Sequence, residues 1–426
     1  MRKLMLLLFT LLLTAPALAG CATAPIQHST AFMVSGSKEE YDAYQKLVDS
    51  FQAANPAYKV ELRYVPDDAD YLRRLAADFA AGAPADVMLL NYRRIAPFAD
   101  EGALGAVGPY LTKSQVIKEG DFYQPALTAF SYKDQLWCIP QNVSSLVIYY
   151  NKALFDAAGV AYPANDWTWT DFVTAAKALT VDKNGDGVTD QYGVGIDPIL
   201  YRLAPFIWQA GGELVDNPAN PTRLSLDSPT ARLAFQWFVD LQVKEKVVPD
   251  AAAEAAQASQ SRFLSGALGM YFNSRRSVPT MRTIKDFDWD VAPLPRGAQA
   301  ASVLHSDGYC MADKSKDKEA AWKFIEYANS VTGQEIVART GRTVPSLRAV
   351  AESASFLDPA QKPAHSQVWL DAVPTLRTVP VMSNWPAIED AASKEVERAF
   401  YGQASVEEAA AAASELTQSL FKGATR

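Results

Sequence analysis

The sequence predicts an α/β protein of two lobes, each a mainly parallel sheet flanked by helices, joined by a hinge of two to three strands. From residue 31 to residue 90, apolar strand-like runs alternate with amphipathic stretches, an order that implies parallel strands with crossover helices. Two later apolar runs, within 136–151 and 267–276, end abruptly in polar side chains. Such ends need partners or a ligand, which favours strands that reach a cleft between two lobes.

The first twenty residues have the pattern of a secretory signal. Arg2 and Lys3 precede an apolar run at 4–13, and Leu-Ala-Gly before Cys21 matches the bacterial lipobox, in which the cysteine is lipidated and becomes the mature N-terminus. A plain signal peptide and a membrane helix are the alternatives, and the run falls short of the ~20 residues that cross a bilayer. We therefore expect a signal at 1–20, a linker at 21–29, and an extracytoplasmic protein, in the periplasm or cell envelope, lipid-anchored at Cys21.

The composition is that of an acidic protein with large cores. Its 426 residues carry a formal net charge of −8, and loss of Arg2 and Lys3 with the signal makes the mature chain more acidic. Nucleic acids and anionic membrane surfaces bind basic patches, so neither is an expected partner. With 49% hydrophobic residues, the length predicts two or three domains.

The first lobe alternates strands and helices. Ser37 and Glu40 form a capping box at the start of one helix. Because ligands of such folds bind beyond the carboxyl ends of the strands, residues 35–37 and 91–93 are candidates. The expected strands are 31–34, 59–65, 87–90, 192–196, 289–292 and 309–312, and the expected helices start near 38, 71, 152, 168, 228, 318 and 406.

Residues 136–151 are the central stretch of the prediction. Two apolar runs are separated by a break that opens on Pro140, which lacks a ladder donor. The polar end at 273–276 repeats this design. We expect crossings between lobes near 138–141, 272–275 and 330–334. Lobe 1 then comprises 30–139 and 273–331, and lobe 2 comprises 140–272 and 332–426.

Two cysteines remain in the mature chain. Cys138 and Cys310 each lie in an apolar, strand-like run. They could pair in an oxidising compartment, or they could be buried separately as small hydrophobic residues. The sequence leaves both possibilities open.

Motifs for catalysis are weak, and we expect a protein that is not an enzyme. His28, His305 and His365 are scattered, and no zinc-binding, nucleophile-elbow or phosphate-cradling motif occurs. Residues 35–38 fit the S-x-x-K pattern of serine acyl-enzymes, but so do residues 315–318 in a charged loop. An extracytoplasmic hydrolase is therefore a minor alternative.

The turn at 182–190 is a candidate calcium site. It matches the first nine positions of an EF-hand loop, but position 12 is Gly193 instead of the bidentate glutamate. A solvated acidic turn is the favoured interpretation, and no other cofactor is expected. The candidate ligands are Asp182, Asn184, Asp186 and Asp190.

Nine tryptophans give the positive signal for a ligand. Trp237 and Trp322 are expected in helix cores, whereas Trp208 and Trp385 are expected in loops, where an amphipathic ring more often meets a ligand. Aromatic faces near amides and carboxylates suit a neutral polyol.

Several blocks of the sequence resemble a known family. They are Ala85-Asp86-Val87 leading to Asn91, Ile139-Pro140 followed by Tyr149-Tyr150-Asn151-Lys152, and the turn from Asp182 to Gly193. Together with the lipobox, they resemble the family 1 extracellular solute-binding proteins of bacterial ABC importers. This resemblance implies a monomer with the type II periplasmic-binding-protein fold. It also implies capture of a disaccharide or oligosaccharide, such as maltose or trehalose, in the interlobe cleft and its delivery to permease subunits.

The resemblance also implies a set of cleft residues. Cys138 departs from the family, in which a small residue often precedes Ile-Pro. Arg275 and Arg276 add positive charge, which could suit a phosphate, so a glycerol-phosphate or glycerophosphodiester ligand is the alternative; a guanidinium can also donate to vicinal hydroxyls. The implied residues, with Trp385 added from its context, are Ser35, Gly36, Ser37, Glu39 or Glu40, Asn91, Tyr92, Gln141, Asn142, Ser144, Trp208, Gly211, Gly212, Asn273, Arg275, Arg276, Asp307, Gly308, Tyr309 and Arg342.

Overall fold

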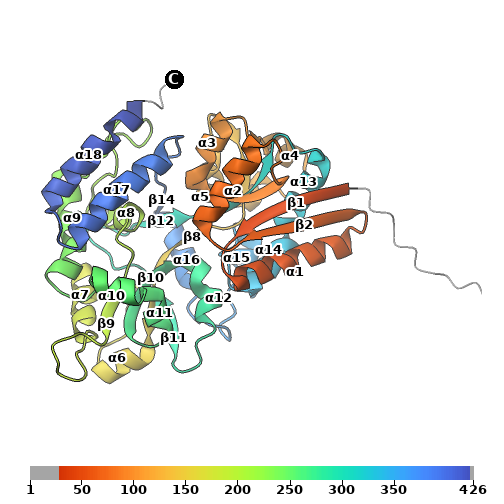
Figure 1. The fold of residues 1–426 in the computed structure, drawn as a ribbon. Coiled ribbons are helices and arrows are strands. Elements are labelled where there is room, and N and C mark those ends of the chain that lie inside the picture. Colours follow the sequence, from red (N-terminus) through yellow and green to blue (C-terminus); the bar gives the residue numbers. More distant parts are fainter. Residues whose placement is uncertain (1–27, 423–426) are drawn as a thin grey trace, which may run out of the picture.

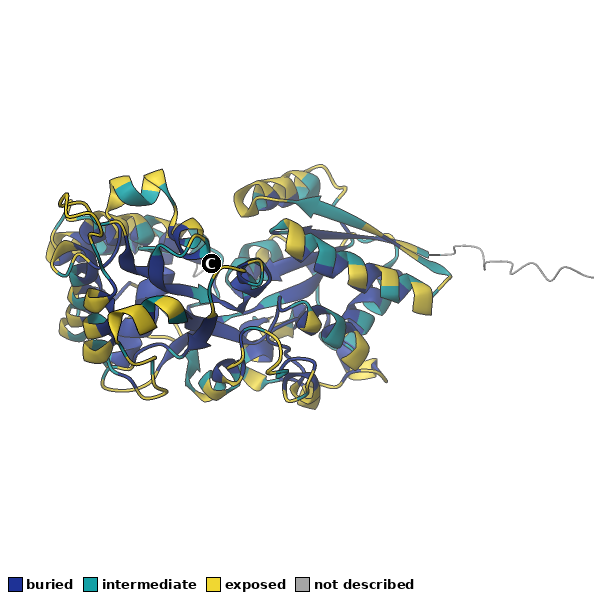
Figure 2. Ribbon diagram, turned by 90° about the horizontal axis from the view of Figure 1, so that it is seen from below, coloured by how far each residue is buried: buried dark blue, intermediate teal, exposed yellow. Residues whose placement is uncertain are grey.

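The computed structural model describes residues 28–422, which form two lobes, each built on a six-stranded sheet flanked by helices (Figure 1). The expected signal at 1–20 and lipidated Cys21 lie outside the described residues. The first strand starts at His28, so the last two residues of the expected linker belong to the fold. In each lobe the strands form the buried centre and the outer helices carry most of the exposed residues (Figure 2).

The sheet of the first lobe has the order β2-β1-β3-β13-β4, with β7 also paired to β13. The pairs of β1 with β2 and β3 are parallel, as the alternating sequence predicts. The later strand β13 is antiparallel to its neighbours. The strands are β1 (His28–Ser35), β2 (Tyr58–Val65), β3 (Val87–Asn91), β4 (Leu104–Gly105), β7 (Cys138–Pro140) and β13 (Asp307–Ala312).

The sheet of the second lobe has the order β14-β12-β8-β10-β9, with β11 also paired to β8. Its central strand β8 is buried along its whole length and antiparallel to β10, β11 and β12. Both sheets are therefore mixed, because strands returning from the hinge enter antiparallel. The strands are β8 (Ser144–Asn151), β9 (Tyr192–Gly195), β10 (Leu268–Ser274), β11 (Trp289–Ala292), β12 (Ser302–His305) and β14 (Leu376–Arg377).

Helices cover both sheets. The capping boxes at Ser37 and Thr168 are present. The first lobe carries α1 (Lys38–Ala54), α2 (Asp68–Ala80), α3 (Ile95–Asp100), α4 (Gly108–Lys113), α5 (Gln124–Ala129), α13 (Lys318–Ala328), α14 (Val331–Arg339) and α15 (Arg348–Ala351), with a short hairpin of β5 (Ser131–Tyr132) and β6 (Gln135–Leu136). The second lobe carries α6 (Lys152–Ala158), α7 (Trp169–Ala178), α8 (Leu200–Gln209), α9 (Pro229–Val243), α10 (Ala251–Ala256), α11 (Ser259–Leu264), α12 (Val278–Met281), α16 (Gln367–Ala372), α17 (Trp385–Phe400) and α18 (Val406–Lys422). Single 3-10 turns are η1 (Tyr92–Arg94), η2 (Glu119–Asp121), η3 (Arg275–Ser277) and η4 (Val373–Thr375).

The chain crosses between lobes at three places, one of them as predicted. It leaves the first sheet after β7 and enters the second at β8. The crossing expected at 272–275 is wrong, because after β10 the chain returns to pair β11 and β12 with β8. It crosses instead between His305 and Asp307, where β12 ends and β13 begins. Residues 273–305 therefore belong to the second lobe.

The last crossing also lies later than expected. Helix α14 packs on α1 and α13, and Leu347 and Val350 join the core of the first lobe. The expected crossing at 330–334 is therefore wrong. The chain returns to the second lobe after α15, where Phe356 packs against Trp369.

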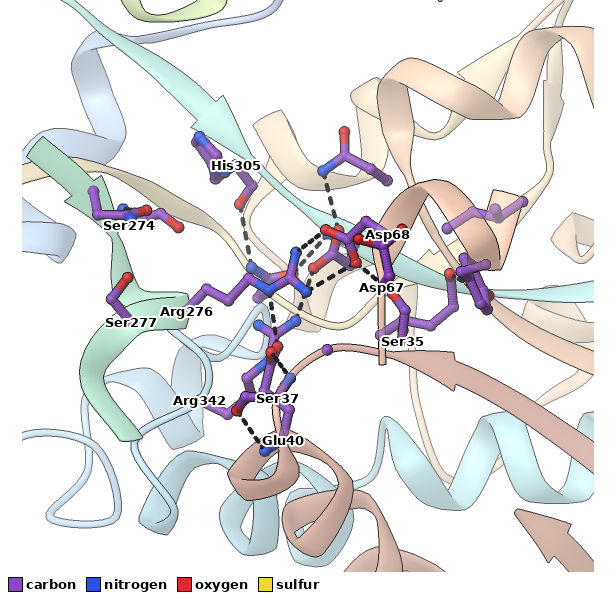
Figure 3. A pocket seen from close by; sticks show the side chains of 18 of the residues that line it. Ser35, Ser37, Glu40, Asp67, Asp68, Ser274, Arg276, Ser277, His305 and Arg342 are labelled. Carbon is purple, nitrogen blue, oxygen red and sulfur yellow. Dashed lines mark hydrogen bonds and ion pairs between the residues drawn. The ribbon is translucent and has the colours of Figure 1, made fainter. Parts of the chain in front are cut away.

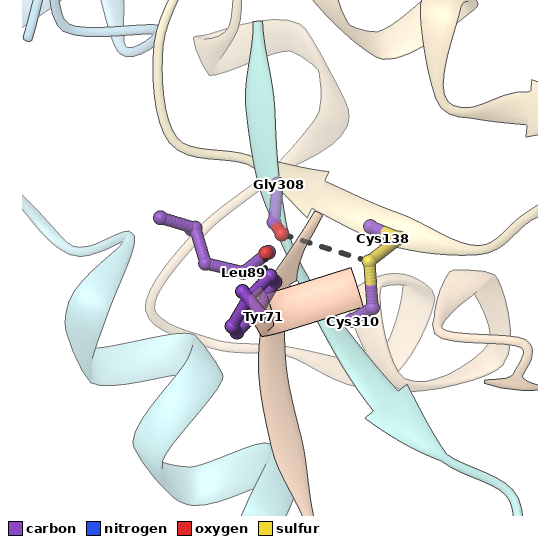
Figure 4. The surroundings of a disulfide bond; sticks show 5 residues. All are labelled: Tyr71, Leu89, Cys138, Gly308 and Cys310. Atoms are coloured by element: carbon purple, nitrogen blue, oxygen red, sulfur yellow. Dashed lines mark hydrogen bonds between the residues drawn. A yellow bond between two sulfur atoms is a disulfide. The ribbon is translucent and has the colours of Figure 1, made fainter. Parts of the chain in front are cut away.

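Cys138 and Cys310 form a disulfide (Figure 4). They are directly opposed residues of the antiparallel strands β7 and β13. Cys138 comes two residues before the end of β7 at Pro140, and Cys310 comes three residues after the start of β13 at Asp307. The disulfide therefore joins the two crossing strands on the first-lobe side of the hinge.

We predict that removing this disulfide lowers stability without changing the fold. The cysteines are 172 residues apart, and loop closure of that length gives an upper bound of about 5 kcal/mol. Denaturant unfolding of Cys138→Ala/Cys310→Ala, beside wild type with and without reductant, measures the effect. Reduced wild type should match the double variant. A double variant as stable as the oxidised protein would contradict the prediction.

Candidate functional site

A cavity of about 640 Å³ lies between the lobes. The first lobe contributes the carboxyl ends of β1 and β3 and the start of α2, and the second lobe contributes the end of β10, α8 and the end of β12 (Figure 3). Its polar lining residues are Ser35, Ser37, Glu40, Asp67, Asp68, Asn91, Arg93, Arg94, Asn142, Arg202, Gln260, Asn273, Ser274, Arg276, Ser277, Thr280, His305, Asp307 and Arg342.

At the first-lobe wall, Glu40 caps the start of α1 and pairs with two arginines. Its Oε2 atom accepts a hydrogen bond of 2.8 Å from the backbone of Ser37 and so closes the capping box of α1. Its Oε1 atom binds the guanidinium groups of Arg276 and Arg342. Gly36 has a φ of +134°, and a Cβ there would lie 2.2 Å from Oε2, so the turn requires glycine.

Arg276 reaches across the cleft from the second lobe. Its guanidinium donates to Glu40 at 2.9 Å and to both oxygens of Asp68 at 2.7 and 3.0 Å (Figure 3). Burial opposes ionisation of Asp68, but the hydrogen bonds and charge of Arg276 outweigh it and lower the pKa of Asp68 to about 2. This link between the lobes is therefore ionised at neutral pH.

The crossing strands carry a second polar group. The Asn142 Oδ1 atom accepts from the backbone of Asp307 at 2.7 Å, and its amide donates to the carbonyl of His305 at 3.2 Å. The carboxylate of Asp307 in turn accepts from Asn91 at 3.0 Å and from Arg342 at 3.3 Å. Asn142 thus holds the two crossings together, at the floor of the cleft.

A further link between the lobes joins η1 to α17. Arg93 forms an ion pair with Glu389, and its guanidinium lies 3.9 Å from the ring centre of Tyr201. Arg94 lies 3.7 Å from Asp390. The cleft is therefore bordered by ion pairs on two sides.

The predicted site residues fall into three groups. Ten line the cavity: Ser35, Gly36, Ser37, Glu40, Asn91, Asn142, Asn273, Arg276, Asp307 and Arg342. Five lie outside the lining and are buried at the hinge: Tyr92, Gln141, Ser144, Gly308 and Tyr309. The remaining six also lie outside the lining: Glu39, Trp208, Gly211, Gly212, Arg275 and Trp385.

Gln141 illustrates the hinge group. Its side chain is 2% exposed, accepts from the hydroxyl of Tyr44 at 3.1 Å and donates to the hydroxyl of Tyr309 at 2.7 Å. Ser144 is 1% exposed and accepts from the backbone of Arg275 at 3.3 Å. These polar groups form their hydrogen bonds within the protein, so they support the residues that line the cleft and do not face the cavity themselves.

The expectation that Trp208 and Trp385 lie in loops is wrong, and neither ring lines the cavity. Trp208 lies in the last turn of α8, a helix buried on every side, and is 2% exposed. The following Gly211, with a φ of +84°, is the left-handed stop of that helix. Trp385 is the first residue of α17, fully buried, and donates to Glu389 at 2.9 Å.

Arg275 is also absent from the cleft. It is 1% exposed, donates to the carbonyl of Gly341 at 3.0 Å and to Ser366 at 2.8 Å, and stacks on Trp369. Burial, with repulsion from Arg282, lowers the pKa of Arg275 to about 9. Because Arg276 is paired with two carboxylates, the adjacent arginines do not form the phosphate site that was the alternative.

The calcium candidate at 182–190 is an exposed turn. Asp182 accepts from the backbone of Gly185 and of Gly187, each at 2.8 Å, and Asp190 accepts from that of Lys183 at 2.8 Å. Among residues 28–422, no group of three or more acidic, histidine or cysteine side chains is placed to hold a metal ion. The carboxylates of Asp182 and Asp190 therefore accept hydrogen bonds from backbone N–H groups of the same turn.

Sequence reasoning missed several polar side chains of the cleft, among them Asp68, Arg202 and His305. Asp68 follows β2, so the same rule that selected Ser35 and Asn91 could have found it. Arg93 was a candidate at the carboxyl end of β3, although it is not among the residues that the family resemblance implies, and it lines the cavity. Arg202 and His305 gave no signal, because one lies in an apolar helix and the other ends an apolar strand.

The two lobes enclose a cavity lined by polar side chains, and comparison with known proteins gives the family. A sequence profile of the bacterial extracellular solute-binding proteins matches residues 35–335, and the chain belongs to this family. The family description places it outside the cytoplasm. Within the described part of the chain, the helices are too short or too polar to cross a membrane.

Three similar proteins illustrate the relationship. The ABC substrate-binding protein of Listeria monocytogenes, solved with cycloalternan, superposes with a TM-score of 0.85 at 24% identity, covering 92% of this chain and 99% of that one. The GacH receptor of Streptomyces glaucescens, solved unliganded and with acarbose, gives 0.80 at 23% identity, covering 93% and 98%. The mannitol-binding protein of Pseudomonas aeruginosa is 24% identical over 413 residues, 89% of this chain and 90% of that one.

We predict that Trp208→Ala destabilises the protein. Removing a buried tryptophan costs about 3–5 kcal/mol through the cavity it leaves. Thermal and denaturant unfolding should show this loss, whereas Tyr162→Ala, at an aromatic side chain that is 42% exposed, should change little. Wild-type stability of Trp208→Ala together with lost ligand affinity would place the ring in the cleft after all.

We predict a pH dependence of stability that arises from His305. Burial, followed by repulsion from Arg202, Arg93, Arg276 and Arg342, lowers the pKa of His305 well below its ordinary value. The folded state therefore keeps the imidazole neutral, and stability is lost as the pH falls below about 6.5, where the unfolded chain takes up the proton. Urea unfolding at pH 7.5 and 5.5 should differ by about 1 kcal/mol from this group. His305→Asn should flatten that slope, and an unchanged slope would contradict the assignment.

Proposed function

We propose that this protein is the lipid-anchored substrate-binding component of an ABC importer, which captures a sugar between its lobes and delivers it to the permease. One observation carries the proposal. Arg276 of the second lobe reaches Glu40 and Asp68 of the first across a cavity lined by polar side chains from both lobes. Such a cleft can enclose a small polar ligand when the lobes close.

The chemistry of the cleft supports a polyhydroxylated ligand. Amides, carboxylates, hydroxyls and guanidinium groups can donate to and accept from the hydroxyl rim of a sugar. The similar proteins above are named or solved with cycloalternan, acarbose and mannitol, which are carbohydrates or a sugar alcohol. The volume lies within the range of small-molecule sites, about 300–1,000 Å³, and suits a short sugar.

Closure is the step that the ligand controls. A ligand that bound the open and closed forms equally would shift nothing, so contacts must come from both lobes. Asn91 and Asp307 supply groups on one side, and Asn273 and Arg276 supply them on the other. The ion pair of Arg276 favours the closed form before the ligand arrives and leaves its amide and hydroxyl neighbours available.

The anchor and the assembly complete the proposal. Cys21 would hold the protein at the membrane through its lipid, as the lipobox indicates. The protein would act as a monomer that presents its closed form to the permease subunits. Globomycin-sensitive processing and labelling with a radioactive fatty acid, lost in Cys21→Ala, would test the anchor.

We predict that Arg276→Gln weakens sugar binding about tenfold or more, because it removes charge-assisted hydrogen bonds between the lobes. A thermal-shift screen of mono-, di- and oligosaccharides, sugar alcohols and glycerol 3-phosphate identifies a ligand, and calorimetry compares the variants. Arg63→Gln is the matched control, because Arg63 pairs with Glu61 on β2 outside the cleft.

Two results would count against the proposal. A protein that none of the sugars or sugar alcohols stabilises is not a carbohydrate receptor. Equal affinities of wild type and Arg276→Gln would show that the ligand binds outside the interlobe cavity.

A further inference from the structure

The second-lobe wall of the cleft carries an arginine whose charge is poorly compensated. Arg202 lies in the first turn of α8, lines the cavity and is 7% exposed. Its three hydrogen bonds are all long: 3.3 Å to His305 Nε2, 3.4 Å to Asp197 and 3.4 Å to Asn273 Oδ1. Its Nε atom is buried and has no hydrogen-bond partner among residues 28–422.

The other arginines of the cavity are better paired. Arg276 is held by Glu40 and Asp68, and Arg342 by Glu40 and Asp307. Arg93 is held by Glu389. Arg94 lies beside Asp390 and is more exposed than Arg202. The carboxylate nearest to Arg202, that of Asp197, is 49% exposed, so water weakens the attraction.

Apart from the half-exposed Asp197, the hydrogen-bond partners of Arg202 are polar groups without negative charge. His305 stays neutral, and its Nε2 atom accepts from Arg202, which leaves the proton on Nδ1. Within the described part of the chain, Nδ1 has no hydrogen-bond partner. Asn273 is held by the hydroxyl of Tyr271 at 2.7 Å, with its Oδ1 atom toward Arg202. Arg202, His305 and Asn273 therefore offer hydrogen-bond donors to the cavity, and none of the three carries a negative charge.

A nearly buried guanidinium with weak pairing is costly, and a ligand that supplies a negative charge recovers that cost. A planar carboxylate matches the guanidinium fork. A phosphate dianion would need a second cation, but the other arginines around the cavity are already paired with carboxylates. The site therefore matches one carboxylate.

We propose that Arg202, with His305 and Asn273, forms a carboxylate subsite, and that the ligand is an acidic sugar, such as a uronic or aldonic acid or a short oligosaccharide that contains one. This proposal rests on the proposed function and names the class of sugar. The hydroxyl groups of the same ligand would meet the first-lobe wall at Asn91 and Asp307.

The test compares matched ligands by calorimetry. The pairs are glucuronate with glucose, galacturonate with galactose, gluconate with sorbitol, and digalacturonate with lactose, and glucose 6-phosphate is the phosphate arm. We expect the acidic member of at least one pair to bind at least about tenfold more tightly than the neutral one. Arg202→Gln should abolish that preference, and Arg202→Lys should retain part of it.

Two further variants separate a ligand contact from a structural role. Asn273→Asp places a carboxylate beside Arg202 and should weaken the acidic member of a pair about tenfold more than it weakens the neutral member. Arg232→Gln, at an exposed arginine of α9 in the same lobe, is the control and should bind as wild type does. Unfolding midpoints measured beside the affinities identify a variant that has simply lost its fold.

Each remaining outcome overturns the subsite. Neutral sugars that bind as well as acidic ones, with equal losses in Arg202→Gln, would show that Arg202 serves hydroxyl groups or the fold, and the sugar-binding function would stand. Preference for glucose 6-phosphate would assign the site to phosphate. If no sugar of either kind binds, the proposed function itself fails, which the neutral members of each pair make visible.

Discussion

The buried carboxylate of Glu40 is the interaction on which the cleft depends. The Glu40 side chain is 4% exposed. It accepts a hydrogen bond from the backbone at the start of α1 and forms ion pairs with Arg276 and Arg342. A charge at such depth is stable only when several partners satisfy it. The partners come from a helix of the first lobe, from the end of β10 in the second lobe and from the segment after α14. The position of the lobes and the charge state of the cleft are therefore set by the same group.

The strands of the hinge are fixed by different contacts on the two sides of the crossing. The disulfide fixes β7 to β13 inside the first lobe, and Asn142 joins the two crossings where they leave it. Beyond that point, Tyr149 of β8 donates to the carbonyl of Ser274 at 2.7 Å, inside the second sheet. Each lobe is thus rigid up to the crossing, which confines bending to the few residues between the sheets.

Much of the fold could be predicted from patterns of apolar residues, because periodicity reports which face of an element is buried. The structure confirms the capping box of α1, the helix start near residue 168, the alternation in the first lobe and the stretch around Pro140. The assignment of strands to lobes could not be predicted. A polar end looks the same on β10, which turns back, and on β7, which crosses, since only long-range pairing distinguishes them.

The candidate site shows the same limit. Residues at the carboxyl ends of strands, such as Ser35 and Asn91, could be found because topology fixes where those ends meet. Trp208 could not be placed, because a buried helix followed by glycines reads like a loop. Arg202 could not be found, because its weak ion pairing depends on long-range contacts that the sequence does not reveal.

The two arginine-containing dipeptides around Glu40 interlock, and this has a mechanical consequence. Arg275 grips the carbonyl of Gly341, while the next residue in each segment, Arg276 and Arg342, reaches Glu40. Arg342 and Glu40 both belong to the first lobe, so their ion pair stays within that lobe. The contacts that join the lobes are those of Arg275 with Gly341 and of Arg276 with Glu40, which come from two consecutive residues. Opening of the cleft at this edge therefore requires that both of these contacts break.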